Sequence, residues 1–168
     1  MKIAIFMVII GLQFVPVISY SQNPEKISFY AFSVHPKGKS VNVYDYPDRD
    51  VVLKILPNKH EDNAGQVLKI IDVKNNWFKI ESFLVDEDLW VKEGDLGVFF
   101  RYQDSTLFLF EKPDINSGKV KLYDNKGYLI IKDLKQDWVL IRVIINGRKY
   151  EGWLPQNKTC SSPYTTCP

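Results

Sequence analysis

Histidine and cysteine, which often carry catalysis and metal binding, are scarce in this chain of 168 residues, which has two of each. His35 and His60 lie in Lys-, Asn- and Pro-rich stretches typical of exposed loops, which argues against a Ser-His-Asp arrangement. A zinc site would favour histidines close to the cysteines, but Cys160 and Cys167 have none near them in sequence. We therefore expect no enzyme activity, no cofactor and no bound metal.

An excess of charge of one sign is also absent. The formal net charge is +2, and acidic and basic residues are interspersed throughout the sequence. This balance argues against a nucleic-acid partner and against an anionic membrane surface. The densest cluster, Asp86-Glu87-Asp88, lacks the rest of a calcium-binding loop pattern, so we expect a solvated loop there.

Long apolar runs are confined to the N-terminus, where residues 3–18 are apolar except for a few interruptions such as Gln13 and Pro16. A membrane span needs roughly 20 mostly apolar residues. The pattern instead predicts a signal peptide over residues 1–21, with no cysteine nearby to carry a lipid. A retained membrane anchor is the alternative, although Pro16 would kink it. We therefore expect a periplasmic or secreted protein without a stable membrane anchor.

The two cysteines lie close together near the C-terminus. Cys160 and Cys167 flank a polar, turn-prone segment, and in an oxidising compartment such a pair is expected to form a disulfide. A loop this short would contribute on the order of 2 to 3 kcal/mol in the chain-entropy model. A metal site is the weaker alternative, because two thiolates alone are a poor ligand set.

The clearest positive feature is an internal repeat. Three short motifs recur in the same order, each about 60 to 66 positions further on. The pairs are VNVYDYP at 41–47 with LFLFEKP at 107–113, DVKNNW at 72–77 with DLKQDW at 133–138, and Trp90-Val91 with Trp153-Leu154. This regularity predicts two copies of one small β-rich module, over residues 22–100 and 101–168.

Short runs of Val, Ile, Phe, Tyr and Trp between Asn, Asp, Gly, Lys and Pro indicate strands joined by turns. Pro47 and Pro113 are expected to end the first strand of each copy. Further strands are predicted at 51–56, 67–73 and 77–81, and at 119–123, 128–134 and 138–144. Asn75-Asn76 and Gln136-Asp137 are expected to form two-residue hairpin turns. Helical periodicity is lacking, so helices should be limited to short turns.

The segment between the copies, residues 97–104, contains Val98, Phe99, Phe100 and Tyr102. Flexible tethers are rich in Gly and Ser rather than in aromatics. We therefore expect a rigid connection, with the two modules packed together.

These motifs resemble the bacterial SH3 (SH3b) domain, and the end of the chain also resembles SH3-like proteins of the Bacteroidetes. The resemblance rests on three motifs in each copy. They are Val41-Asn42-Val43 with Pro47, Asn76-Trp77-Phe78-Lys79-Ile80, Trp90-Val91 with Leu96, residues 107–113, Asp137-Trp138-Val139 and Gly152-Trp153-Leu154. Leu89 departs from the family pattern, which places glycine before the tryptophan. The resemblance implies an all-β fold of two tandem SH3-like small β-barrels, and binding of cell-wall peptides or protein segments through an aromatic groove.

In such a barrel, aromatic side chains of the first strand and of the loop before the last strand would line the groove. Aromatic faces bind extended peptides or sugars with large contact area and little loss of entropy. The candidates are Tyr44, Tyr46 and Trp90 in the first copy and Phe108, Phe110 and Trp153 in the second. Phe108 and Phe110 could instead be buried between the modules. Trp77 and Trp138 follow hairpins, and we assign them to the core.

Two functions remain open. The first is a non-enzymatic binding module that recognises peptidoglycan peptides or an extended protein segment through an aromatic groove. The alternative is a periplasmic protein-protein interaction through a broad surface, as in a scaffold, inhibitor or immunity-type protein. An aromatic-lined cleft would favour the first, and a flat apolar patch would favour the second.

Overall fold

Strands make up all of the regular structure that the computed structural model describes, apart from the 3₁₀ turn η1 (Gln156–Lys158). The described residues are 27–34, 40–49, 52–57, 67–81, 89–101, 106–122 and 127–161. The prediction of an all-β chain with helices limited to short turns is therefore confirmed for these residues. None of their helical segments is long and apolar enough to cross a membrane.

Several predicted features lie outside the described residues. They are the signal peptide at 1–21, both histidines, the acidic run at 86–88 and Cys167. Cys160 is described and is buried, with 8% of its surface exposed. Its disulfide with Cys167 stays a prediction.

The sequence gives rise to thirteen strands in the described part of the chain. The first seven are β1 (Phe29–Ser33), β2 (Ser40–Tyr44), β3 (Val52–Pro57), β4 (Val67–Lys74), β5 (Trp77–Glu81), β6 (Leu89–Lys92) and β7 (Leu96–Phe100). The others are β8 (Leu107–Phe110), β9 (Lys119–Leu122), β10 (Tyr128–Lys135), β11 (Trp138–Ile145), β12 (Arg148–Pro155) and β13 (Thr159–Cys160). Both expected hairpin turns are present, and Asn75, Asn76 and Gln136 adopt the positive φ angles that such turns require.

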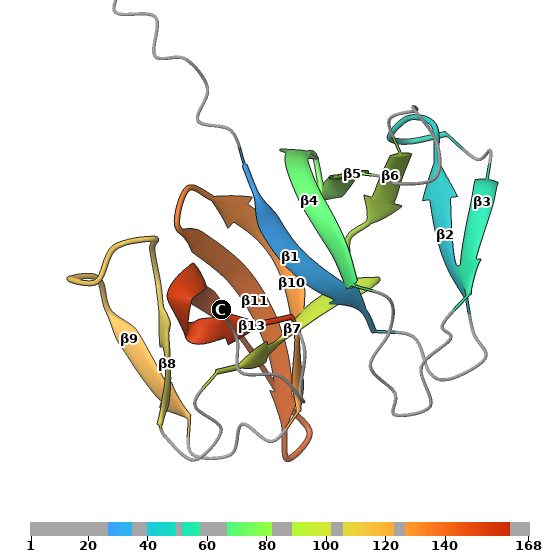
Figure 1. Cartoon of the computed structure of the whole chain (residues 1–168). Coiled ribbons are helices and arrows are strands. Elements are labelled where there is room, and N and C mark those ends of the chain that lie inside the picture. The colour runs from blue at the N-terminus through green and yellow to red at the C-terminus, as the bar shows by residue number, and fades with distance from the viewer. Residues whose placement is uncertain are drawn as a thin grey trace, which may run out of the picture.

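All of these strands belong to one antiparallel sheet. Its order is β3-β2-β6-β5-β4-β1-β7-β10-β11-β12-β8-β9, with β13 paired to β7 (Figure 1). The hairpin strands β3 and β9 each pair with one described neighbour, so the order begins and ends there. The expectation of closed barrels is therefore wrong for the described strands, which form an open sheet.

The strand pairing of the first half is repeated in the second. The order β1-β4-β5-β6-β2-β3 in the first half corresponds to β7-β10-β11-β12-β8-β9 in the second. The strand that follows each set pairs with its first strand, since β7 pairs with β1 and β13 pairs with β7. The corresponding strands β4 and β10 have a register shift at the same place, between Ile70 and Asp72 and between Ile131 and Asp133. Such bulges bend a strand and increase its twist.

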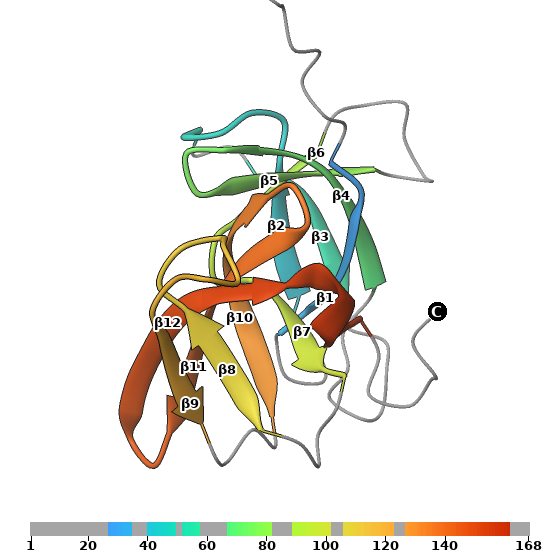
Figure 2. The same cartoon turned by 90° about the vertical axis from the view of Figure 1, so that its left-hand side faces the viewer.

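Strand β7 belongs to both halves. Gly97 lies opposite Phe32 of β1 on one side and Ile130 of β10 on the other. Figures 1 and 2 show β7 between the two sets of strands. Part of the segment interpreted as a connector is thus a central strand, because β7 pairs with β1 on one side and with β10 on the other. Its residues Val98 and Phe100 are buried.

One hydrophobic core runs through both halves. It includes Ile70 and Phe78 of the first half, Val98 of β7, and Ile131 and Ile141 of the second, all at most 2% exposed. A half-buried ion pair adds a polar link, since Lys132 of β10 contacts Glu93 in the turn after β6. Burial lowers the pKa of Lys132, and the nearby Arg142 lowers it further. The halves are therefore packed together, as the sequence predicted.

Candidate functional site

An aromatic cluster forms in the first half where β2, β5 and β6 meet. Tyr44 lies opposite Trp90 in the β2–β6 pairing, and its ring meets Trp77 edge to face with centroids 4.9 Å apart. Trp77 and Trp90 are only 5% and 7% exposed, while Tyr44 is half-buried. Trp77 is therefore buried, as predicted, and Trp90 presents little of its ring to a ligand.

The loop after β2 folds back onto this cluster. The Trp77 indole Nε1 donates a hydrogen bond to Asp48 Oδ1 at 3.0 Å, and the neighbouring Pro47 is buried. Asp48 has a φ of 63°, a left-handed conformation that Asp adopts more readily than most residues. The polar edge of Trp77 is thus satisfied within the chain.

Tyr46 lies apart from the buried tryptophans, on the surface. It is 49% exposed, and Lys74 Nζ donates a hydrogen bond to its hydroxyl at 2.9 Å. The Arg49 guanidinium lies 5.7 Å from its ring centroid and pairs with Asp45. The hydrogen bond and the charge of Lys74 lower the pKa of Tyr46.

The second half repeats the aromatic arrangement. Phe110 lies opposite Trp153 in the β8–β12 pairing and meets Trp138 edge to face, with centroids 5.5 Å apart. Trp138 is half-buried, in contrast to the buried Trp77, so its assignment to the core is met only in part. The second cluster is therefore the more open of the two.

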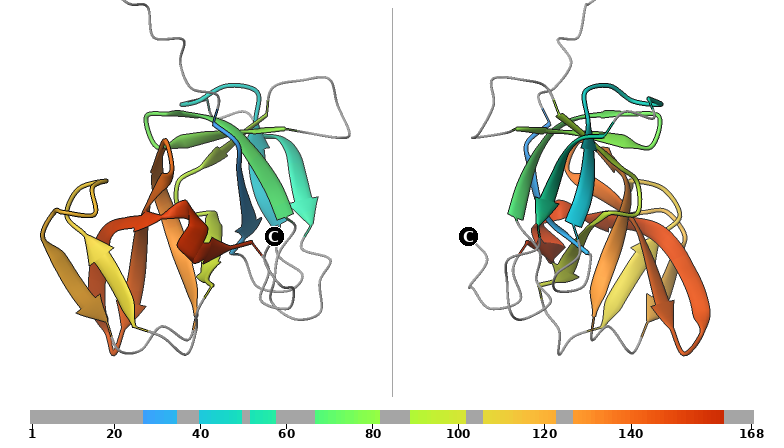
Figure 3. Two further views of the ribbon diagram at one scale, coloured as in Figure 1. Left: turned by 60° about the vertical axis from the view of Figure 1, so that its left-hand side comes forward. Right: turned by 90° about the vertical axis from the view of Figure 1, so that its right-hand side faces the viewer.

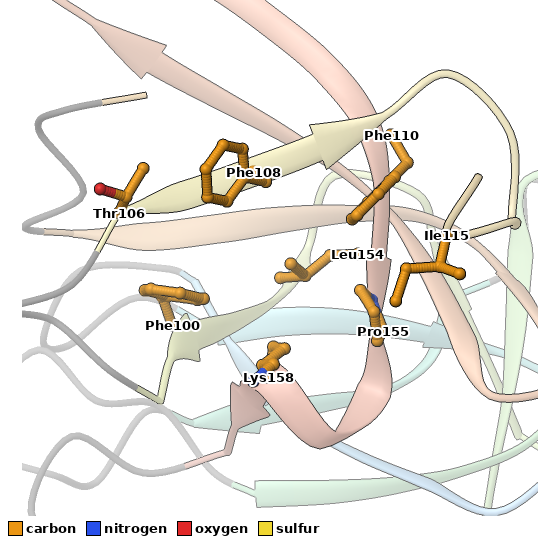
Figure 4. A pocket seen from close by; sticks show the side chains of 8 residues that line it. All are labelled: Phe100, Thr106, Phe108, Phe110, Ile115, Leu154, Pro155 and Lys158. Atoms are coloured by element: carbon orange, nitrogen blue, oxygen red, sulfur yellow. The ribbon is translucent and has the colours of Figure 1, made fainter. Parts of the chain in front are cut away.

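A pocket of about 280 Å³ lies beside this second cluster (Figure 4). Phe108 and Phe110 alternate along β8 with the core residues Leu107 and Leu109, so the two rings share the opposite face of the strand. The pocket is lined by Phe100, Thr106, Phe108, Phe110, Ile115, Leu154, Pro155 and Lys158. Its walls are aromatic and aliphatic, as expected of a site for an apolar side chain.

Of the six predicted site residues, the pocket brings together Phe108 and Phe110, whereas Trp153 is half-buried and does not line it. Sequence reasoning missed Phe100, because its segment was interpreted as a connector. It also missed Ile115, which is 67% exposed in the turn that follows Pro113. An exposed isoleucine in a polar turn is the one signal that could have identified the loop as part of a site.

Lysines surround the aromatic floor. Lys119 Nζ lies 5.1 Å from the ring centroid of Phe108 and 5.8 Å from that of Phe110. Lys121 Nζ lies 6.0 Å from the ring centroid of Phe108, and Lys158 lines the pocket itself. Within the described residues no three metal-ligating side chains are grouped together. This arrangement can bind an apolar group beside a negative charge.

No protein-family model matches this chain, and no curated protein matches it. Among solved structures, it is similar to NlpC2 of Trichomonas vaginalis, at 14% identity and a TM-score of 0.31, over 79% of this chain and 48% of that one. It is also similar to NlpC1 of the same organism, at 13% identity and a TM-score of 0.31, over 89% of this chain and 51% of that one. The chain spans about half the length of each structure. Likeness at this level carries no conclusion about fold or function.

Proposed function

We propose that this protein is a non-enzymatic, extracytoplasmic binding module that holds an extended peptide segment in the pocket of its second half. The segment belongs to peptidoglycan or to a partner protein. The observation that carries the proposal is the convergence of Phe100, Phe108 and Phe110 around one pocket of about 280 Å³. That volume is slightly below the usual range for small-molecule pockets, about 300 to 1,000 Å³, so it fits one or two side chains of a longer ligand.

The architecture that we propose for this function is two tandem SH3-like modules over residues 22–100 and 101–168. The repeated strand order and the 3₁₀ turn before β13 support it. In this arrangement the first module has a structural role, because its loop covers Trp77, and the second module binds the ligand.

The alternative, interaction through a broad face, is favoured by a different observation. Tyr30 and Tyr128 are 53% and 46% exposed on the face of β1 and β10 that also carries Phe99 of β7. Phe32 stacks on Phe99 with centroids 4.5 Å apart and meets Tyr128 edge to face. An exposed aromatic face across the junction of the two halves suits a flat protein partner.

The two functions can be separated by substitutions in the full chain. Sedimentation with isolated peptidoglycan and binding to an array of short synthetic peptides would be measured for Phe108→Ala, with Tyr46→Ala as the control. Tyr46 is an exposed aromatic outside the pocket. Loss of binding in Phe108→Ala alone supports the pocket, and loss in a Tyr30→Ser/Tyr128→Ser variant alone supports the broad face. A wild-type chain that binds neither probe would overturn the proposal.

A further inference from the structure

The edge strand β9 provides a second surface, separate from the pocket. Within the described chain β9 pairs with β8 alone and is the last strand of the sheet. Figure 1 and the left panel of Figure 3 show it at the outer margin of the molecule. A strand in this position presents backbone N–H and C=O groups that another strand can pair with.

The register determines which backbone groups face outward. Glu111 N–H donates to the Gly118 carbonyl at 2.8 Å, so these two opposed residues form a hydrogen-bonded pair. Hydrogen-bonded and non-hydrogen-bonded pairs alternate in an antiparallel ladder, which places Leu109 and Val120 in the next hydrogen-bonded pair. The N–H and C=O groups of Lys119 and Lys121 consequently point away from β8, toward the open side.

The side chains of β9 divide by charge between the two faces of the sheet. Lys119 and Lys121 are exposed and lie on the face of Phe108 and Phe110, which they contact through cation-π interactions. Val120 points to the other face and is 49% exposed. A strand that pairs with β9 therefore meets a lysine, an apolar valine and a second lysine in succession.

We propose that β9 binds an extended acidic segment of a partner protein as an additional antiparallel strand. Carboxylates of the partner lie opposite Lys119 and Lys121, and the apolar residue between them packs on Val120. Opposite charges directly across an antiparallel pair are favourable, and like charges are unfavourable. The same lysines therefore disfavour pairing of β9 with a second copy of itself, because lysine would face lysine. This inference goes beyond the peptide pocket and does not depend on it.

The test uses two synthetic peptides, one alternating glutamate with valine and one alternating lysine with valine, measured by fluorescence anisotropy against the full chain. We expect the acidic peptide to bind roughly tenfold more tightly, and its affinity to fall as salt is added. The glutamates opposite Lys119 and Lys121 are the residues whose N–H groups face β9. N-methylation of the glutamates should therefore abolish binding, whereas N-methylation of the valines should be tolerated.

Protein variants complete the test. Lys119→Glu/Lys121→Glu should reverse the preference between the peptides, while Lys135→Glu/Arg148→Glu makes the same charge change on exposed residues of β10 and β12 and should leave it unchanged. Ile115→Ser removes an apolar side chain from the pocket and leaves the contacts of Phe108 with the two lysines in place. It should therefore retain binding of the acidic peptide, which separates this edge from the pocket. Failure of the acidic peptide to bind, equal effects of the two N-methylation patterns, or indifference to the lysine reversal would each overturn the proposal.

Discussion

Trp77 donates its indole hydrogen bond to Asp48, and the second half has no equivalent contact among the described residues. Asp114 follows Pro113 as Asp48 follows Pro47, yet its carboxylate accepts from the backbone N–H of Asn116 at 2.9 Å. The carboxylate of the loop after β8 thus stabilises its own turn and forms no hydrogen bond with Trp138. This difference explains why two similar sequences produce one covered aromatic cluster and one open pocket.

The contact between Asp48 and Trp77 should stabilise the first half. Asp48→Gly removes the acceptor while tolerating the positive φ, and leaves the buried Trp77 N–H without its partner. We expect a loss of about 1 to 3 kcal/mol in the free energy of unfolding, measured by urea denaturation. Asp48→Asn keeps both an oxygen acceptor and the φ preference, so it should lose less. Equal losses in the two variants would contradict this role.

Gly152 should resist substitution because β8 passes close to it. An added Cβ would lie 2.9 Å from Leu109 Cβ and 3.0 Å from the Phe110 carbonyl oxygen. Gly152→Ala is therefore expected to destabilise the chain by about 1 to 3 kcal/mol, read from the shift of the thermal unfolding midpoint. Gly127→Ala is the control, since no heavy atom lies within 4 Å of its added Cβ. A midpoint that moves equally in both variants would rule out the close approach as the cause.

Tyr46 should ionise at a lower pH than an isolated tyrosine. Lys74 lowers the pKa of Tyr46 from 10.0, first through their hydrogen bond and then through its charge, and Arg49 lowers it least. Because the pKa is lower in the folded chain, any contribution to stability appears as the pH rises through the folded pKa and is absent near neutrality. Phenolate absorbance would be followed against pH for the wild type and for Tyr46→Phe. The difference between the two curves gives the titration of Tyr46. Lys74→Gln should raise this pKa, and Arg49→Gln should raise it less.

The predicted disulfide between Cys160 and Cys167 can be tested on the purified protein. We expect no reaction with a thiol reagent before reduction, and reaction of both cysteines after reduction and unfolding. Because Cys160 is buried next to β7, the reduced chain should also lose stability, on the order of 2 to 3 kcal/mol. Rapid labelling of Cys167 in the unreduced protein would refute the pairing.

Much of the strand pattern followed from local signals. The predicted strand at 77–81 coincides with β5, and the polar pairs Asn75-Asn76 and Gln136-Asp137 form the hairpin turns. These features depend on side-chain alternation and turn chemistry, which neighbouring residues determine. The role of β7 could not be predicted in this way, because a short apolar run looks alike in a buried strand and in a packed connector.

The candidate site was predictable only in part, for a related reason. Alternation along β8 correctly placed Phe108 and Phe110 on the face away from the core. Trp90 was expected to face a ligand, but it is buried beside Tyr44. Whether an aromatic ring is covered depends on where loops such as that of Asp48 settle, and this is a property of tertiary packing.

The sharing of β7 has a consequence for how such a chain can be shortened or divided. A deletion that removes β7 with the second half leaves β1 without one of its partners, and a deletion that removes it with the first half takes the same support from β10. Either truncation would turn a central strand into an exposed edge strand, and exposed edge strands promote aggregation by pairing with other chains. Neither half is therefore expected to fold stably without the other, even though short motifs recur between them.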